Sequence, residues 1–127
     1  MNHQVVSEHA RPIADSAFEF ADGSGGLARA RKMRDNWPSH DVDIWAQMAE
    51  LGWLGICVPE DQSGLGLGAG DMCVLLESVG KLLVPEPLVS SIAAAGLLAD
   101  CDTDTARIHQ SDQVGRMAEQ HQIGSLF

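Results

Sequence analysis

Between residues 41 and 58 the chain changes from a helical apolar pattern to a continuous apolar run. From Asp41 the apolar side chains fall at the i, i+3, i+4 spacing of a helix with one buried face, at Val42, Trp45, Met48, Ala49 and Leu51. Gly52 follows, where a helix C-terminus favours a left-handed residue. Residues 53–58 are too apolar for the surface and stop at Pro59, so we expect a short strand-like extended piece inside the core.

A second amphipathic pattern follows a glycine-rich loop at residues 60–70. Asp71 is placed to cap a helix whose apolar stripe runs through Leu83, at Met72, Leu75, Leu76, Val79, Leu82 and Leu83. Pro85 and Pro87 then predict an extended corner, because the residue before a proline avoids the α region. Pro87 suits a first helical turn.

Residues 88–99 predict a final helix that is apolar nearly all round and rich in small side chains. Such a helix must be covered on several sides. The remaining chain has few apolar residues to cover it, because residues 100–127 are polar and predict a frayed or weakly helical tail.

The N-terminal third predicts a helical pair. Apolar spacing at Ile13, Phe18 and Phe20 is helical, but Pro12 is expected to interrupt it. Residues 22–26 form a flexible Gly-Ser break, and strong helix formers return at residues 27–34. Ser39 is expected to cap the following helix, with Asp41 and Asp43 in its first turn.

These elements predict an all-α domain, a small helical bundle of about four to five helices with a short irregular extended piece and a Gly-rich loop between helices. We expect this domain to occupy residues 1–102 and a divergent polar tail to occupy residues 103–127.

Charge narrows the possible partners. The chain has 127 residues and a formal net charge of -10, with 8 Lys and Arg against 18 Asp and Glu. Coulomb repulsion therefore disfavours nucleic acid and anionic membranes as partners.

No apolar stretch reaches the roughly 20 residues that a membrane helix needs, and charged residues near the N-terminus argue against a secretory signal. We expect a cytoplasmic protein whose three cysteines (Cys57, Cys73 and Cys101) are reduced and mostly buried.

Basic residues gather at residues 27–34, which hold four of the eight, Arg29, Arg31, Lys32 and Arg34. One interpretation is a docking surface for an acidic partner. The other is a solvated helix face that lies over the acidic remainder of the chain.

The loop contains a weak nucleotide-binding pattern. Gly64, Gly66 and Ala69 formally satisfy the G-x-G-x-x-G/A fingerprint. That motif needs a preceding parallel strand in a doubly wound sheet, and here helices are expected on both sides. The glycines are better explained by a compact loop with positive φ angles and close backbone approach.

Candidates for catalysis and metal binding are few. Glu77 could be a buried acid with a raised pKa, or a salt-bridge partner at the helix surface. A metal site could be imagined at His40 with Asp41 and Asp43, but helix capping explains these residues better. His109 and His121 are also poor metal ligands, because no supporting carboxylate pattern accompanies them. We therefore expect no catalytic residue and no metal site in this chain.

The central stretch resembles the N-terminal helical domain of the acyl-CoA dehydrogenase family. The resemblance is good over residues 37–100, weak before them and absent after about residue 105. It is carried by an ordered set: Leu51, Gly52, Trp53, Leu54, Gly55, Ile56, Val58, Pro59, Glu60, Gly64, Leu65, Gly66, Leu67, Gly68, Asp71, Glu77 and Gly80.

The resemblance implies a chemistry. In this family a carboxylate base removes the α-proton of an acyl-CoA thioester while FAD takes the β-hydride, which gives a 2-enoyl-CoA. The helix at residues 88–99 would wall the acyl pocket, with Leu88, Ser91, Ile92 and Ala95 near the thioester tail. Alternatively, its small residues only allow close helix packing.

The flavin domain and the catalytic base of the family have no counterpart in this sequence. FAD is therefore not expected to bind the chain alone, and the candidate partners are an acyl-CoA substrate and either a flavin-bearing chain or further copies of this chain in a homo-oligomer. The abrupt loss of resemblance suggests a shortened or frame-altered gene product. The alternatives are a non-catalytic helical module that binds a partner protein and a truncated product without a function of its own.

Overall fold

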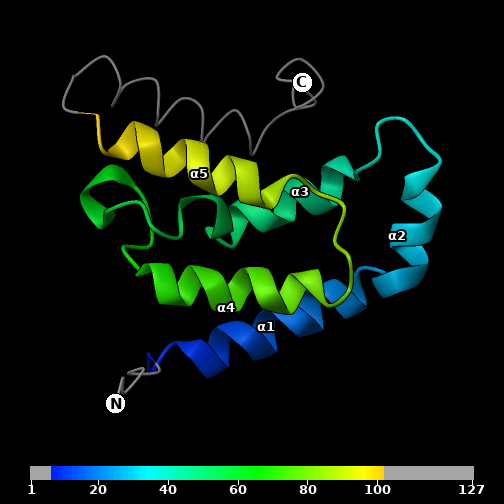
Figure 1. Cartoon of the computed structure of the whole chain (residues 1–127), viewed down its shortest axis with the longest axis horizontal. Helices are drawn as coiled ribbons and strands as arrows, with labels where there is room; N and C mark the ends of the chain where they lie inside the picture. Colours follow the sequence, from blue (N-terminus) through cyan, green and yellow to red (C-terminus); the bar gives the residue numbers. More distant parts are fainter. Residues whose placement is uncertain (1–6, 102–127) are drawn as a thin grey trace.

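The computed structural model describes residues 7–101 (Figure 1). Over this range the chain forms only helices, which confirms the all-α prediction and the number of helices. They are α1 (Ala10–Gly23), α2 (Gly26–Arg34), α3 (Val42–Glu50), α4 (Ala69–Gly80) and α5 (Leu88–Ala99), with short 3-10 helices η1 (Trp53–Gly55) and η2 (Glu60–Gln62) between α3 and α4. The expected tail at residues 103–127, with His109 and His121, lies outside the described residues.

The helices form two layers around the central stretch. α1 packs along α4, while α5 and α3 both contact η1 on the other side (Figure 1). α2 stands at one end of the molecule. The core between the layers contains Ala17, Trp45, Met48, Trp53, Leu54, Ile56, Leu75, Val79, Leu88 and Ile92.

The stretch after α3 is buried as predicted, but its conformation is not the expected strand-like one. Gly52 has φ 80° and ends α3 in the left-handed region, as the sequence indicated. The chain then closes 3-10 turns, with the Ile56 amide donating to the Trp53 carbonyl at 3.3 Å. A strand needs a neighbouring strand to accept its hydrogen bonds, and residues 7–101 contain none, so local turns satisfy these groups instead.

The Gly-rich loop folds back onto this buried stretch. The amides of Leu65, Gly66 and Leu67 donate to the carbonyls of Gly55, Val58 and Ile56 at 3.0, 2.8 and 2.9 Å. A Cβ on Gly64 would lie 2.0 Å from the Val58 carbonyl oxygen. The close backbone approach that the glycines predicted is therefore real at Gly64.

Three predicted helix ends are wrong by a few residues. The N-cap of α3 is Asp41, not Ser39, because the Asp41 carboxylate accepts from the amides of Asp43 and Ile44. α4 begins two residues before Asp71, which lies in its first turn and accepts from the Gly68 amide at 3.3 Å. α4 ends at Gly80, so Leu83 lies beyond the helix and is exposed.

The N-terminal pair forms as predicted, with Ser24 and Gly25 as the joint. The expected interruption at Pro12 does not occur. Pro12 lies in the first turn of α1, where a backbone amide has no acceptor within the helix, so the missing N–H costs no hydrogen bond.

Candidate functional site

The predicted pocket-wall residues share one side of α5. Leu88, Ser91, Ile92 and Ala95 are all buried, with exposed fractions of 3 to 8%. Leu88 and Ile92 belong to the core of this chain. The structure therefore brings the four residues together, facing the interior of the domain.

The opposite side of α5 is apolar and exposed. Val89 and Leu97 are 64% and 71% exposed, and Ala93 between them is exposed as well. Sequence analysis anticipated that α5 lacks a cover, and within residues 7–101 this side has none. It did not identify which residues face outward, because a helix that is apolar all round carries no amphipathic signal.

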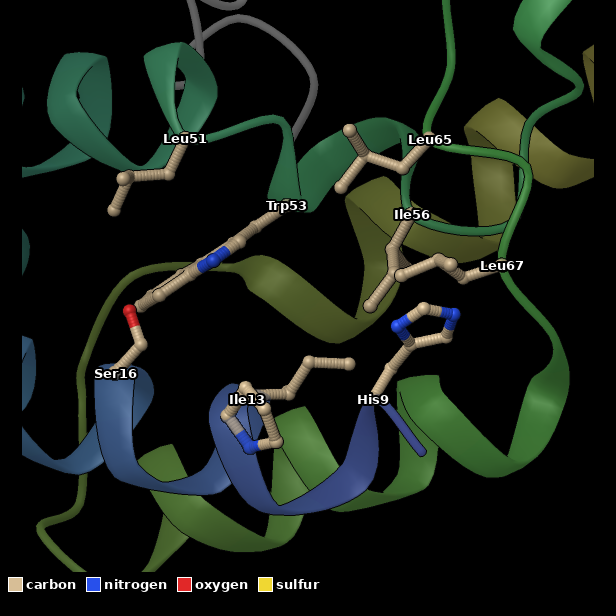
Figure 2. A pocket seen from close by; sticks show the side chains of 9 residues that line it. His9, Ile13, Ser16, Leu51, Trp53, Ile56, Leu65 and Leu67 are labelled. Atoms are coloured by element: carbon tan, nitrogen blue, oxygen red, sulfur yellow. The ribbon is translucent and has the colours of Figure 1, made fainter. Parts of the chain in front are cut away.

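A cavity of about 360 Å³ lies elsewhere, between α1 and the stretch around η1 (Figure 2). Its walls are mostly apolar and contain His9, Pro12, Ile13, Ser16, Leu51, Trp53, Ile56, Leu65 and Leu67. The Trp53 ring is held by an edge-to-face contact with Phe20 of α1, at a centroid distance of 5.1 Å. None of the predicted site residues lies in this cavity.

The polar groups of this cavity do not form a catalytic pair. His9 and Ser16 lie at opposite ends of it (Figure 2). They are seven residues apart on one helical segment, which corresponds to about 10 Å along the axis. A serine nucleophile needs its base within hydrogen-bond reach, so the cavity can hold a small apolar group but shows no acyl-transfer chemistry.

Glu77, the only catalytic candidate from the sequence, lies on the surface. Its side chain is 71% exposed and pairs with Lys81 at 3.4 Å on the same helix. The salt-bridge interpretation is confirmed, and the interpretation as a buried acid is wrong.

Residues 7–101 contain two buried carboxylates, Asp71 in the first turn of α4 and Glu86, and the sequence did not indicate that Glu86 is buried. Its side chain is fully buried and binds the Arg29 guanidinium through both oxygens, one of them at 3.1 Å from Nη2. It also accepts from the Asp41 amide at 3.3 Å. The only signal in the sequence was a lone acid between two prolines, because its partners are 57 and 45 residues away.

The cysteines are less buried than expected. Cys73 and Cys101 are exposed, and Cys57 is half-buried. Burial raises the pKa of the Cys57 thiol above its usual value, and the neighbouring Asp71 carboxylate and Cys73 raise it further. Cys57 therefore stays a protonated thiol at neutral pH and is a poor nucleophile.

Neither metal ligands nor a phosphate site are found in the described part. Residues 7–101 contain no group of three or more His, Cys, Asp and Glu side chains that could hold a metal ion. The amides of residues 64–67 all donate to carbonyls of residues 55–59, so they leave no donors for a flavin pyrophosphate. This loop therefore does not fit the phosphates of FAD.

A membrane-spanning helix is also missing from residues 7–101, since every helix there is too short or too polar to cross a bilayer.

Comparison with known proteins gives one consistent result. The family described as "Acyl-CoA dehydrogenase, N-terminal domain" matches residues 7–107. The match therefore includes residues 7–36, over which the resemblance described under Sequence analysis is weak. No solved structure gives a significant match.

Several curated relatives carry related names. Acyl-CoA dehydrogenase FadE34 of Mycobacterium tuberculosis is 31% identical over 63% of this chain and 12% of its own length. Mitochondrial isovaleryl-CoA dehydrogenase of Solanum tuberosum is 40% identical over 56% of this chain and 17% of its own length. Acyl-CoA dehydrogenase IpdE2 of Mycolicibacterium smegmatis is 29% identical over 95% of this chain and 37% of its own length. The chain therefore spans little more than a third of these relatives at most.

Proposed function

Because this chain belongs to the acyl-CoA dehydrogenase family through its N-terminal domain, we propose that it is the helical portion that encloses the acyl pocket of a flavin-dependent enzyme. The complete enzyme would oxidise an acyl-CoA to a 2-enoyl-CoA. The observation that carries the proposal is α5, which is apolar on both sides but is covered by the rest of residues 7–101 on only one.

In this proposal α5 is a wall with two layers. Leu88, Ser91, Ile92 and Ala95 form the inner layer and fix the helix to the domain. Val89, Ala93 and Leu97 form the outer layer, which the acyl tail and the rest of the enzyme would cover. The wall excludes water from the tail through burial of apolar surface.

The remaining parts of the active site come from elsewhere. Neither buried carboxylate of residues 7–101 is placed for α-proton removal, since Glu86 is engaged by Arg29 and Asp71 accepts from the Gly68 amide at the start of α4, and neither lines the cavity beside α1. The amides of residues 64–67 are satisfied and offer no flavin site. We propose that a flavin-bearing partner chain supplies both the base and the flavin site, because further copies of this chain in a homo-oligomer would bring only the same residues. FAD is then a cofactor of the assembled enzyme, with an acyl-CoA as its substrate.

We also propose a cytoplasmic location and a role in fatty acid metabolism. The three cysteines support a reducing compartment, because all of them are free thiols.

The outer layer of α5 is tested by enlarging one of its small residues. Ala93→Phe should leave the isolated domain folded, because Ala93 is exposed. In an enzyme reconstituted with the flavin-bearing partner, it should shorten the acyl chain that is accepted. The measurement is kcat/KM across acyl-CoA chain lengths.

Ala28→Phe is the matched control, because Ala28 is also an exposed helical alanine but lies on α2. An unchanged chain-length profile for Ala93→Phe, or the same change for Ala28→Phe, would contradict α5 as the wall.

A further inference from the structure

A second cleft lies at the end of the molecule where α2 stands. It measures about 560 Å³ and is lined by α2, by Ser39 and by the turn after α4, through Leu27, Ala30, Arg31, Arg34, Ser39, Leu83 and Pro85. It shares no residue with α5 or with the cavity beside α1.

Two guanidinium groups give this α2 cleft a local positive charge. Arg31 and Arg34 are three residues apart, so they lie on neighbouring positions of one helix face. Arg31 makes no salt bridge to any residue of 7–101. Among the described residues, Arg34 forms a salt bridge only with the exposed Asp35, at 3.3 Å, a surface pair of little energy. Arg29 does not contribute, because Glu86 neutralises it.

The other side of the α2 cleft is apolar and unusually exposed. Leu83 is 65% exposed and Leu27 is 40% exposed. Leu83 also has φ 51°, a left-handed conformation that is unfavourable for a residue other than glycine. The turn after α4 therefore keeps the Leu83 side chain exposed to solvent beside the two arginines, although the Leu83 backbone is in an unfavourable conformation.

We propose that the α2 cleft binds a segment of a partner protein in which one or two carboxylate side chains lie next to an apolar side chain. Guanidinium groups pair well with carboxylates, and Leu27, Leu83 and Pro85 would cover the neighbouring apolar group. A nucleic acid or an anionic membrane is a poorer fit, because an extended polyanion would also meet the rest of a chain with net charge -10. This inference goes beyond the dehydrogenase role and does not rest on it.

The test titrates the full isotopically labelled chain with capped heptapeptides, followed by amide chemical shifts. Each peptide carries two glutamates among leucine and phenylalanine in varied order, and a matched set carries glutamine instead. We expect the glutamate peptides to shift the amides of α2, Ser39 and Leu83. The glutamine peptides should bind at least about tenfold more weakly, since charge-assisted bonds are lost.

Paired variants separate the cleft from general charge. Arg31→Gln with Arg34→Gln should abolish the preference for glutamate. Arg11→Gln with Lys32→Gln removes the same amount of positive charge from exposed positions outside the cleft. This double variant should retain the preference for glutamate. Circular dichroism checks that both double variants fold.

Three results would overturn the proposal. One is equal binding of the glutamine and glutamate peptides, or no binding by either set. Another is an equal loss of the preference for glutamate peptides in both double variants. The third is an equally strong, arginine-dependent response to inorganic phosphate or to phosphatidylserine vesicles, which would indicate a general anion site.

Discussion

At the scale of single residues, Glu86 joins three segments that are far apart in sequence. It binds Arg29 of α2 and the amide at the start of α3 from the corner between α4 and α5. Both charged side chains are removed from water, with exposed fractions of 9% and 0%. The pair is therefore expensive to break, although it is not necessarily stabilising relative to an apolar pair.

Removal of the Glu86 charge should destabilise the domain. Glu86→Gln leaves the Arg29 charge buried without a counterion, so we expect a loss of about 3 kcal/mol or more in the free energy of unfolding. Urea unfolding followed by tryptophan fluorescence measures this loss.

Glu77→Gln is the control, because its exposed pair with Lys81 should contribute less than about 1 kcal/mol. If Glu86→Gln fails to fold, Arg29→Met with Glu86→Leu should restore folding, because an apolar pair leaves no buried charge. Similar effects of the two Glu→Gln changes would contradict a buried pair.

Among the described glycines, Gly64 is the one where an added Cβ would make the shortest contact, 2.0 Å from the Val58 carbonyl oxygen. In Gly64→Ala the new Cβ meets backbone, the Val58 carbonyl oxygen, which cannot move aside as a flexible side chain could. We expect a loss of about 1–3 kcal/mol in unfolding free energy, typical of overpacking.

Gly70→Ala provides the comparison, since a Cβ there meets nothing within 4 Å and Gly70 is helical. It should be neutral or stabilising by up to about 1 kcal/mol. A tolerated Gly64→Ala would show that the loop does not lie against Val58.

At the scale of elements, α5 has two apolar sides with different roles. Ile92→Ala removes a core side chain that is 3% exposed, so we expect the isolated domain to lose about 2–5 kcal/mol. Leu97→Ala, at 71% exposure, should change the unfolding free energy by less than about 0.5 kcal/mol. Chemical denaturation of both variants measures the difference, and equal losses would contradict the orientation of α5.

How far the sequence could predict each element depends on how local its physics is. Apolar spacing predicted α3 and α4, Gly52 predicted the end of α3, and Pro87 with the apolar run after it predicted α5, because these signals depend on neighbours within a few residues. The conformation of residues 53–58 was missed, because an apolar run shows burial but does not distinguish a strand from tight turns. The buried pair of Arg29 and Glu86 was missed, because its partners meet only after folding.

The candidate site was predicted to a similar extent. Sequence pattern identified α5 as a helix in need of a cover, and the structure shows which side lacks one. Pattern could not assign the sides, because small and apolar residues surround the helix evenly. That Leu88, Ser91, Ile92 and Ala95 belong to the wall of an acyl pocket remains a proposal, in which they fix α5 to the domain while the opposite side of the helix meets the tail.

At the scale of the whole molecule, the chain corresponds to one part of its longer relatives. It matches the N-terminal domain of its family over residues 7–107 and spans 12 to 37% of the relatives described above. Its described residues hold apolar surface on α5 and a basic cleft on α2, but no flavin site. We therefore expect its function to require a second chain.

Flavin binding tests this account most directly. The purified chain is titrated with FAD and followed by flavin absorbance, first alone and then mixed with the product of any adjacent reading frame that encodes a flavin-bearing portion of the family. The account predicts no bound flavin for the chain alone and stoichiometric flavin in the mixture, with bleaching on addition of an acyl-CoA. Flavin bound by the chain alone would contradict its dependence on a partner, and no flavin in the mixture would contradict its role in a dehydrogenase.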